Sequence, residues 1–161
     1  MTKKYKKLFD LSGKVAIVTG SSRGIGASIA EALAEFGASV VLSSRSKEAV
    51  DEVANKIIKN GYNALSCECH VGEEDQLKNL IDTTLKKYDK IDILVNNEGI
   101  NPVFDRLENA DEKLFNKIMD INVKAAFKLS NMAMKHMKNN KSGSIINISS
   151  VEGHKPDKGL G

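Results

Sequence analysis

The chain has 161 residues, of which 41% are hydrophobic and 28% are charged, and its formal net charge is +3. This composition predicts one soluble domain, residues 1–161, and the even mixture of charges disfavours nucleic acid or a membrane surface as a partner. No stretch is long and apolar enough to span a bilayer, and no secretory or transit peptide is visible. The lysine-rich residues 1–12 are interpreted as a polar lead-in.

The first predicted strand, Val15–Val18, runs into a turn that contains Gly20, Gly24 and Gly26. A helix is expected to follow, and its inward stripe is predicted to be Ile25, Ile29, Ala32, Leu33 and Phe36. A strand that turns through glycines into a helix presents free N–H groups and the positive end of a helix dipole to an anion. The spacing G-x-x-x-G-x-G matches neither common phosphate-binding fingerprint, so the glycines alone also allow a simple tight connection.

Four further strands are predicted at Ser39–Leu42, Ala64–Cys69, Ile91–Val95 and Ser144–Ile148. Two amphipathic helices lie between the earlier strands, with the inward residues Val50, Val53, Ala54, Ile57 and Ile58 in one and Leu77, Leu80, Ile81, Leu85 and Tyr88 in the other. This alternation predicts a parallel sheet covered by helices on both faces. Ligands are therefore expected outside the carboxyl ends of the strands.

A long helix is predicted between the fourth and fifth strands. Asp111 is expected to cap it, and it should run through Asn122 towards Lys138. Its inner side is predicted to carry Leu114, Phe115, Ile118 and Met119. The only cysteines, Cys67 and Cys69, lie two residues apart in the third strand. We interpret them as reduced core residues of a cytoplasmic protein, and we expect no metal site.

Polar residues follow each predicted strand. Ser44 and Arg45 follow the second strand, at the position where an NAD-binding domain usually has an acidic residue on the ribose. Arg23 in the glycine turn and Arg45 could converge on the 2′-phosphate of NADP, although two exposed surface arginines are the alternative. The later strands are followed by His70 and Val71, by Asn96, Asn97, Glu98 and Gly99, and by Ser149 and Ser150.

Four motifs together resemble the short-chain dehydrogenase/reductase family. They are T-G-S-S-R-G-I-G from Thr19, N-N-E-G from Asn96, D-I-N-V-K around Asn122 and N-I-S-S from Asn147. The resemblance implies an α/β fold, a Rossmann-type doubly wound parallel sheet that here ends after about five strands. It also implies an oxidoreductase that transfers hydride between NADP(H) and a small-molecule alcohol or carbonyl substrate, and a homo-oligomer in the full-length form.

The resemblance also assigns residues to roles. Gly20, Ser22, Arg23 and Ile25 would hold the phosphates, with Gly24, Gly26 and Ser44 in the same site and Arg45 on the 2′-phosphate. His70 and Val71 would lie along the adenine, and Asn97 and Gly99 would border the adenosine side. Ser150 would hydrogen-bond the substrate oxygen, and Asn122 would help to position a water in the proton relay.

Three departures from the family pattern stand out. Glu98 replaces the usual alanine, and a carboxylate near a phosphate costs electrostatic energy unless it turns outward. His70 stands where an aspartate is common in the family. A neutral imidazole can still hydrogen-bond to adenine or stack on it. The Tyr-x-x-x-Lys motif would fall just past Gly161, so the chain is expected to be an inactive fragment with poor solubility or partial folding. A non-catalytic nucleotide-binding or interaction module is the alternative.

Overall fold

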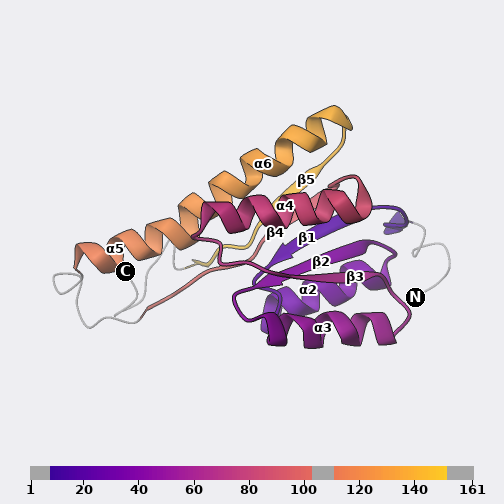
Figure 1. The fold of residues 1–161 in the computed structure, drawn as a ribbon, viewed down its shortest axis with the longest axis horizontal. Helices are drawn as coiled ribbons and strands as arrows, with labels where there is room; N and C mark the ends of the chain where they lie inside the picture. The colour runs from indigo at the N-terminus through magenta and orange to yellow at the C-terminus, as the bar shows by residue number, and fades with distance from the viewer. Residues whose placement is uncertain (1–7, 103–110, 152–161) are drawn as a thin grey trace.

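The computed structural model describes residues 8–102 and 111–151, so residues 1–7 of the lead-in lie outside the described part. Five parallel strands form one sheet in the order β3-β2-β1-β4-β5 (Figure 1). The strands are β1 (Val15–Thr19), β2 (Ser39–Ser44), β3 (Ala64–Glu68), β4 (Ile93–Asn96) and β5 (Ser144–Asn147). The helical segments are α2 (Gly24–Glu35), α3 (Lys47–Lys59), α4 (Glu74–Tyr88), α5 (Glu112–Met119), η2 (Asp120–Lys124) and α6 (Ala125–Asn139).

The chain reverses its direction of travel across the sheet at the central strand β1. It first builds outward through β2 to β3 and then crosses over to β4 and β5 on the other side of β1. Helices α2 and α3 cover one face, and α4 and α6 cover the other (Figure 1). This is the predicted Rossmann-type doubly wound sheet. The carboxyl ends of β1 and β4 lie side by side where the strand order reverses, which is where such folds bind ligands.

The side chains on the two faces of β1 pack in two separate hydrophobic cores. Ile17 packs with α4 and α6, whereas Ala16 and Val18 pack with α2 and α3. All five residues of β1 are buried, which explains the continuous apolar run in its sequence. Cys67 and Cys69 are buried free thiols, in agreement with their predicted role as reduced core residues.

The predicted inward stripe of α2 is wrong by about one residue. The buried residues are the small ones, Gly26, Ala30 and Ala34, while Ile25 is 64% exposed. Ile29 and Leu33 are half-buried and pack at the margin of the core. Small side chains at four-residue intervals let the helix lie close to the sheet, so the larger residues are displaced to its sides.

The predicted long helix after β4 is interrupted by a π-helical turn, η2. Asp111 caps α5 as expected, because its Oδ1 accepts a hydrogen bond from Leu114 N at 2.7 Å. The predicted inner side is only partly right: Leu114 and Ile118 are half-buried, but α5 has no buried residue and Phe115 is 59% exposed. The physical reason is that α5 extends past the sheet (Figure 1). The buried stripe of this segment begins only at Ile121.

Other expectations differ in smaller ways. Ile58 was expected on the inner side of α3, but it is 50% exposed because Ile57 takes the inward position.

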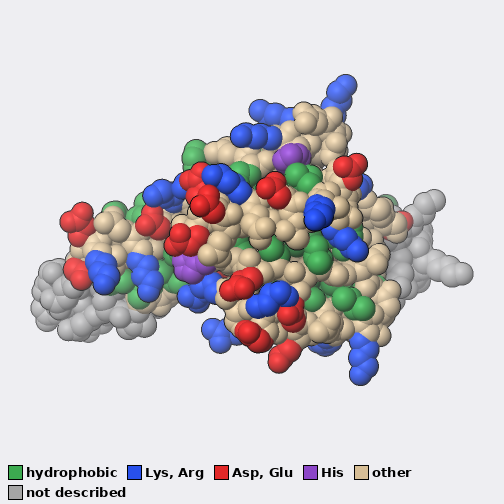
Figure 2. Space-filling view, viewed as in Figure 1, with side chains coloured by type: hydrophobic (Ala, Val, Ile, Leu, Met, Phe, Trp, Pro, Cys, Tyr) green, Lys and Arg blue, Asp and Glu red, His purple; other side chains and the backbone are tan. Residues whose placement is uncertain are grey.

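Lys, Arg, Asp and Glu side chains alternate over the face drawn in Figure 2, and no patch of a single sign dominates it. Every helix within residues 8–102 and 111–151 is too short or too polar to cross a membrane.

Candidate functional site

A groove of about 690 Å³ lies at the carboxyl ends of β1, β2 and β4. It is lined by Gly20, Ser22, Arg23, Gly24, Ile25, Gly26, Ser44, Arg45, Ser46, Ala49, Asn97, Glu98 and Gly99. The structure therefore brings together all of the predicted coenzyme residues except His70 and Val71. Sequence reasoning missed Ser46 and Ala49, although Ser46 carries a local signal because it is the N-cap of α3 and accepts from Ala49 N at 3.2 Å.

The glycine turn shapes one wall of the groove. Gly20 and Gly24 have positive φ angles of 61° and 57°, a backbone region that glycine adopts without a steric penalty. Arg23 is the N-cap of α2, but its side chain does not cap the helix, and the first turn holds no acidic residue. The N-terminal amides of α2 at the groove are thus available to an anion. A methyl group on Gly24 would find no atom within 4 Å, which shows that the wall is open there.

A clamp between β1 and β4 fixes this turn. The buried Thr19 Oγ1 accepts hydrogen bonds from the backbone N of Asn97 at 3.0 Å and of Glu98 at 3.1 Å. Asn97 Nδ2 in return donates to Thr19 O at 2.9 Å and Gly20 O at 3.1 Å. The second asparagine of N-N-E-G therefore ties the end of β4 to the start of the glycine turn.

A second contact fixes the turn to β2. The fully buried Ser21 Oγ donates to Val18 O at 2.9 Å and accepts from Ser43 N at 3.0 Å. No pattern in the sequence distinguishes this serine from Ser22, which lines the groove instead. The turn is held from both neighbouring strands, so its amides are positioned before any ligand arrives.

The charges in the groove come from Arg23, Arg45 and Glu98. Both arginines are exposed, and neither forms an ion pair with the part of the chain that the structure describes. Burial raises the pKa of Glu98, and the positive charges of Arg45 and His70 offset only part of that rise. The groove therefore offers two guanidinium groups without a carboxylate partner in the described part of the chain, and one carboxyl group that is easier to protonate than usual.

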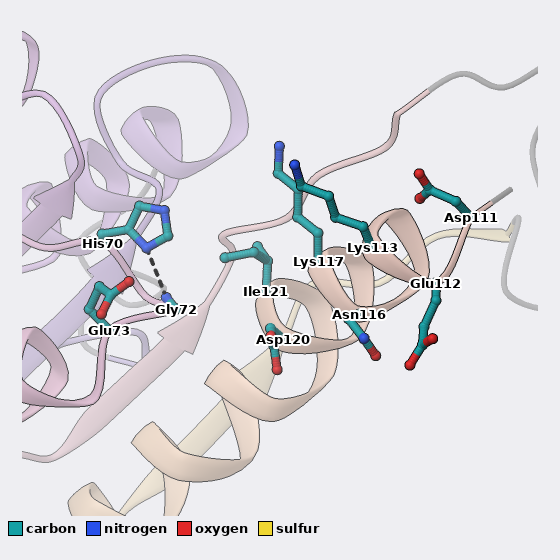
Figure 3. A pocket seen from close by; sticks show the side chains of 10 residues that line it. All are labelled: His70, Gly72, Glu73, Asp111, Glu112, Lys113, Asn116, Lys117, Asp120 and Ile121. Atoms are coloured by element: carbon teal, nitrogen blue, oxygen red, sulfur yellow. Dashed lines mark hydrogen bonds between the residues drawn. The ribbon is translucent and has the colours of Figure 1, made fainter.

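His70 and Val71 lie outside this groove. His70 lines a neighbouring groove of about 760 Å³ between the end of β3 and α5, and its Nδ1 accepts from Gly72 N at 3.2 Å (Figure 3). Val71 is 5% exposed and its side chain packs in the core. Their predicted contacts with adenine stay predictions. The groove of Figure 3 carries four acidic residues and two lysines, Lys113 and Lys117, so its charge does not favour a phosphate.

Neither of the two residues predicted to be catalytic lines the groove of the glycine turn. The side-chain amide of Asn122, in the π-helical turn, forms two hydrogen bonds with the backbone of Ile100. Oδ1 accepts from Ile100 N and Nδ2 donates to Ile100 O, each at 2.8 Å. It holds the segment that follows Gly99 against the helix, and π-helical turns are often found at functional sites. Ser150 lies just beyond β5 and is exposed. Their catalytic roles stay predictions.

The first asparagine of N-N-E-G has a structural task. Asn96 is buried, and its Nδ2 donates to Asn147 Oδ1 at 2.8 Å and to Ser130 Oγ at 3.1 Å. It joins the ends of β4 and β5 to α6. Because Ser150 follows Asn147 closely in the chain, this contact also sets where the N-I-S-S segment leaves the sheet.

A doubly wound parallel sheet with a glycine turn and an asparagine clamp at its reversal point defines an α/β nucleotide-binding domain. Residues 14–161 match the family model described as short chain dehydrogenase, and the chain belongs to this family of oxidoreductases.

Relatives and solved structures agree with this assignment. The chain is 46% identical to Tropinone reductase-like 3 of Erythroxylum coca over 158 residues, which are 97% of this chain and 60% of that protein. It is 39% identical to Dehydrogenase/reductase SDR family member 4 of Oryctolagus cuniculus, over 94% of this chain and 58% of that protein. The chain thus spans about three fifths of the length of these curated relatives.

Two solved structures superpose closely. A metagenomic short-chain oxidoreductase in complex with NADP has a TM-score of 0.88 and 36% identity, over 93% of this chain and 68% of that chain. A 7α-hydroxysteroid dehydrogenase complexed with NADH and 7-oxo glycochenodeoxycholic acid has a TM-score of 0.91 and 33% identity, over 99% of this chain and 61% of that chain.

Proposed function

We propose that these residues form the coenzyme-binding part of an NADP(H)-dependent oxidoreductase that acts on a small-molecule alcohol or carbonyl compound. The observation that carries the proposal is that the groove beside the glycine turn holds two arginines, Arg23 and Arg45, and neither has an ion-pair partner among the described residues. No acidic residue stands at the end of β2, where Ser44 and Arg45 lie. A guanidinium group can hold a phosphate through two parallel hydrogen bonds, which favours NADP over NAD.

The residues present fit such a coenzyme. The open backbone at Gly24 and the uncapped start of α2 suit a pyrophosphate, and Ser22 borders the same space. Arg45 would hold the 2′-phosphate, and Gly99 would border the adenosine side. The bound coenzyme supplies or accepts a hydride. In this proposal Ser150 donates a hydrogen bond to the substrate oxygen. Asn122, which is hydrogen-bonded to the backbone of Ile100, helps to position a water.

The proton donor of the reaction is proposed to lie outside these 161 residues. The family pattern places it in a Tyr-x-x-x-Lys motif, and none of Tyr5, Tyr62 and Tyr88 has a lysine four residues later. A tyrosine beside a lysine suits this step because a nearby ammonium lowers the pKa of the phenol. We therefore expect the 161-residue chain to bind the coenzyme without catalysing turnover.

The coenzyme preference can be measured by fluorescence titration with NADPH and NADH. We expect NADPH to bind at least about tenfold more tightly, the scale of one charge-assisted bidentate contact. The variant Arg45→Ala should lose most of this preference. The control Lys59→Ala, which removes an exposed cation at the far end of α3, should keep it. Equal affinities in the wild-type protein would refute NADP selection by Arg45.

Two further parts of the proposal concern the cellular form of the protein. The free, buried thiols of Cys67 and Cys69 suit a reducing compartment, so we place the protein in the cytoplasm. We also propose that the full-length protein is a homo-oligomer. The exposed apolar side chains on α5 and α6 support association.

A further inference from the structure

Among the residues that the structure describes, Glu98 is the only acidic one that lines the groove of the glycine turn. It follows Asn97 at the carboxyl end of β4 and is half-buried. Its carboxylate lies directly over Gly20, since a Cβ placed on that glycine would be 2.7 Å from Glu98 Oε2. The carboxylate therefore faces the wall that is built to receive an anion.

The backbone of Glu98 is fixed, but its carboxylate is not. The backbone N donates to Thr19 Oγ1 at 3.1 Å, and the preceding Asn97 is bonded to both Thr19 and Gly20. Within residues 8–102 and 111–151, the carboxylate itself forms no hydrogen bond or ion pair. No bond inside the groove would have to be broken for this group to take up a proton.

We propose that Glu98 couples the binding of an anionic dinucleotide in this groove to the uptake of one proton, so that affinity falls as the pH rises. The inference rests on the proposed function, because it needs a dinucleotide in the groove. Its physical basis is that a phosphate brought near a half-buried carboxylate favours the neutral acid. Burial already raises the pKa of Glu98, so the proton is taken up more readily than by an exposed glutamate.

The sign of the effect follows from the charges. At low pH the neutral acid does not repel the ligand, whereas above the pKa of the free protein the carboxylate must be protonated or displaced. One coupled proton gives at most a tenfold loss of affinity per pH unit, between the pKa of the free and of the bound protein. The effect is therefore expected on the alkaline side of the ordinary carboxyl range.

Other charged or titratable groups face Glu98 from the neighbouring elements. Arg23 lies in the glycine turn and Arg45 follows β2, and each brings a guanidinium group to the groove. Burial raises the pKa of Cys69 to about 12, so its thiol stays neutral in the range of interest. His70 lies near enough to act on Glu98, and the 2′-phosphate of NADP has its own pKa near 6. These last two groups must be separated from Glu98 by variants and by the choice of ligand.

The test is isothermal titration calorimetry with NADP⁺ and with NAD⁺ at pH 5, 6.5 and 8, in two buffers of different protonation enthalpy. For the wild-type protein we expect both ligands to bind at least about tenfold more weakly at pH 8 than at pH 5, with a net uptake of protons. Glu98→Gln keeps the shape of the side chain and removes its titration. It should bind more tightly at pH 8 and should lose the proton uptake at residue 98, while the uptake at other groups remains. NAD⁺ lacks the 2′-phosphate and so isolates the contribution of the protein.

The possible outcomes are distinct. If the wild type binds at pH 5 but not at pH 8, while Glu98→Gln binds at both, the coupling is supported. If only Glu98→Gln binds, at every pH, the carboxylate excludes the dinucleotide instead of taking up a proton, and the coupling is overturned. Equal pH profiles and proton counts for both proteins, with binding present, would overturn the role of Glu98 and leave the proposed function standing. Absence of binding by both proteins at every pH would overturn the proposed function and this inference with it. Thermal unfolding of both proteins, together with a second variant, Glu98→Ala, separates these results from a folding defect.

Discussion

At Gly26 the first turn of α2 leaves no room for a side chain. A Cβ at this position would be 2.4 Å from Gly20 O and 2.5 Å from Asn97 Nδ2, and neither atom can move freely because both belong to the clamp. Gly26→Ala should lower the free energy of unfolding by about 1–3 kcal/mol, as overpacking does, and should weaken coenzyme binding. Urea denaturation and NADPH titration measure the two effects.

Gly99→Ala is the matched control for Gly26→Ala. It adds the same methyl group in the same groove, but the nearest atom, Asn122 Oδ1, lies at an ordinary 3.7 Å. We expect its stability to stay within about 0.5 kcal/mol of wild type. If Gly26→Ala were as stable as Gly99→Ala, the close approach of α2 to the turn would not be a constraint on this fold.

Asp92 binds three groups at the opposite edge of the sheet. It accepts from Val15 N at 2.9 Å, and its carboxylate lies 3.3 Å from Lys14 Nζ and 3.2 Å from Lys90 Nζ. Burial acts to raise the pKa of Asp92, but the bond from Val15 and the two lysines outweigh it, so the pKa is lowered. The carboxylate therefore stabilises the folded state above the unfolded pKa of about 3.9, and this contribution is lost as the pH falls through the lower folded value.

Replacing this carboxylate should consequently matter only when it is charged. Asp92→Asn should lower the free energy of unfolding by about 1–3 kcal/mol at pH 7, and the difference from wild type should shrink below about pH 4. Denaturation curves at pH 7 and pH 3.5 measure it, with the exposed Asp82→Asn as control. A difference that stays constant across this range would mean that the charge of Asp92 is not the stabilising feature.

Helix α2 depends on small residues where it meets the sheet. Ala30 is fully buried between helix α2 and the sheet, whereas Ala32, two positions further along the helix, is exposed. Ala30→Leu should push the helix from the sheet and lower the free energy of unfolding by about 1–3 kcal/mol, while Ala32→Leu should change it by less than about 0.5 kcal/mol. Thermal or urea unfolding of the two variants distinguishes these sites, and equal effects would contradict the observed stripe.

The molecule as a whole exposes more apolar surface along α5, η2 and α6 than on its other helices. Phe115, Met119, Val123 and Phe127 recur at four-residue intervals and are 40–66% exposed. The edge strand β5 adds Ile146, which is 41% exposed. Several exposed large apolar side chains at regular spacing along one helical segment are typical of a protein interface. It supports the proposed homo-oligomer and the expectation of poor solubility, both of which stay predictions.

Light scattering after size-exclusion chromatography tests the association. We expect the wild-type protein to form dimers or larger species, and the double variant Phe115→Ser with Phe127→Ser to form them less, because it removes two large apolar side chains from that surface. Lys113→Ser with Lys135→Ser, two exposed lysines on the same helices, is the control and should leave the mass unchanged. A wild-type monomer at all concentrations would rule out this surface as an interface in the chain tested.

The sequence alone determined the order of strands and helices along the chain and the parallel sheet covered on both faces, and its family resemblance added the doubly wound architecture and most residues of the groove at the glycine turn. Its signals are local: the apolar run Val15–Val18, the glycines that need positive φ angles, and the cap at Asp111. Because parallel strands bring their carboxyl ends to one edge, residues after separate strands could be assigned to one site from their positions in the chain.

Only the tertiary structure decided which faces are buried and what each polar group contacts. Ile25 and Phe115 fit a helical apolar pattern but are exposed, because one helix approaches the sheet through smaller residues and the other extends past it. The clamp by Asn97, the bonds of Asn122 to Ile100 and the position of Glu98 over the glycine turn join segments far apart in the sequence. Such contacts depend on how the elements meet in space, which a periodic pattern within one element does not record.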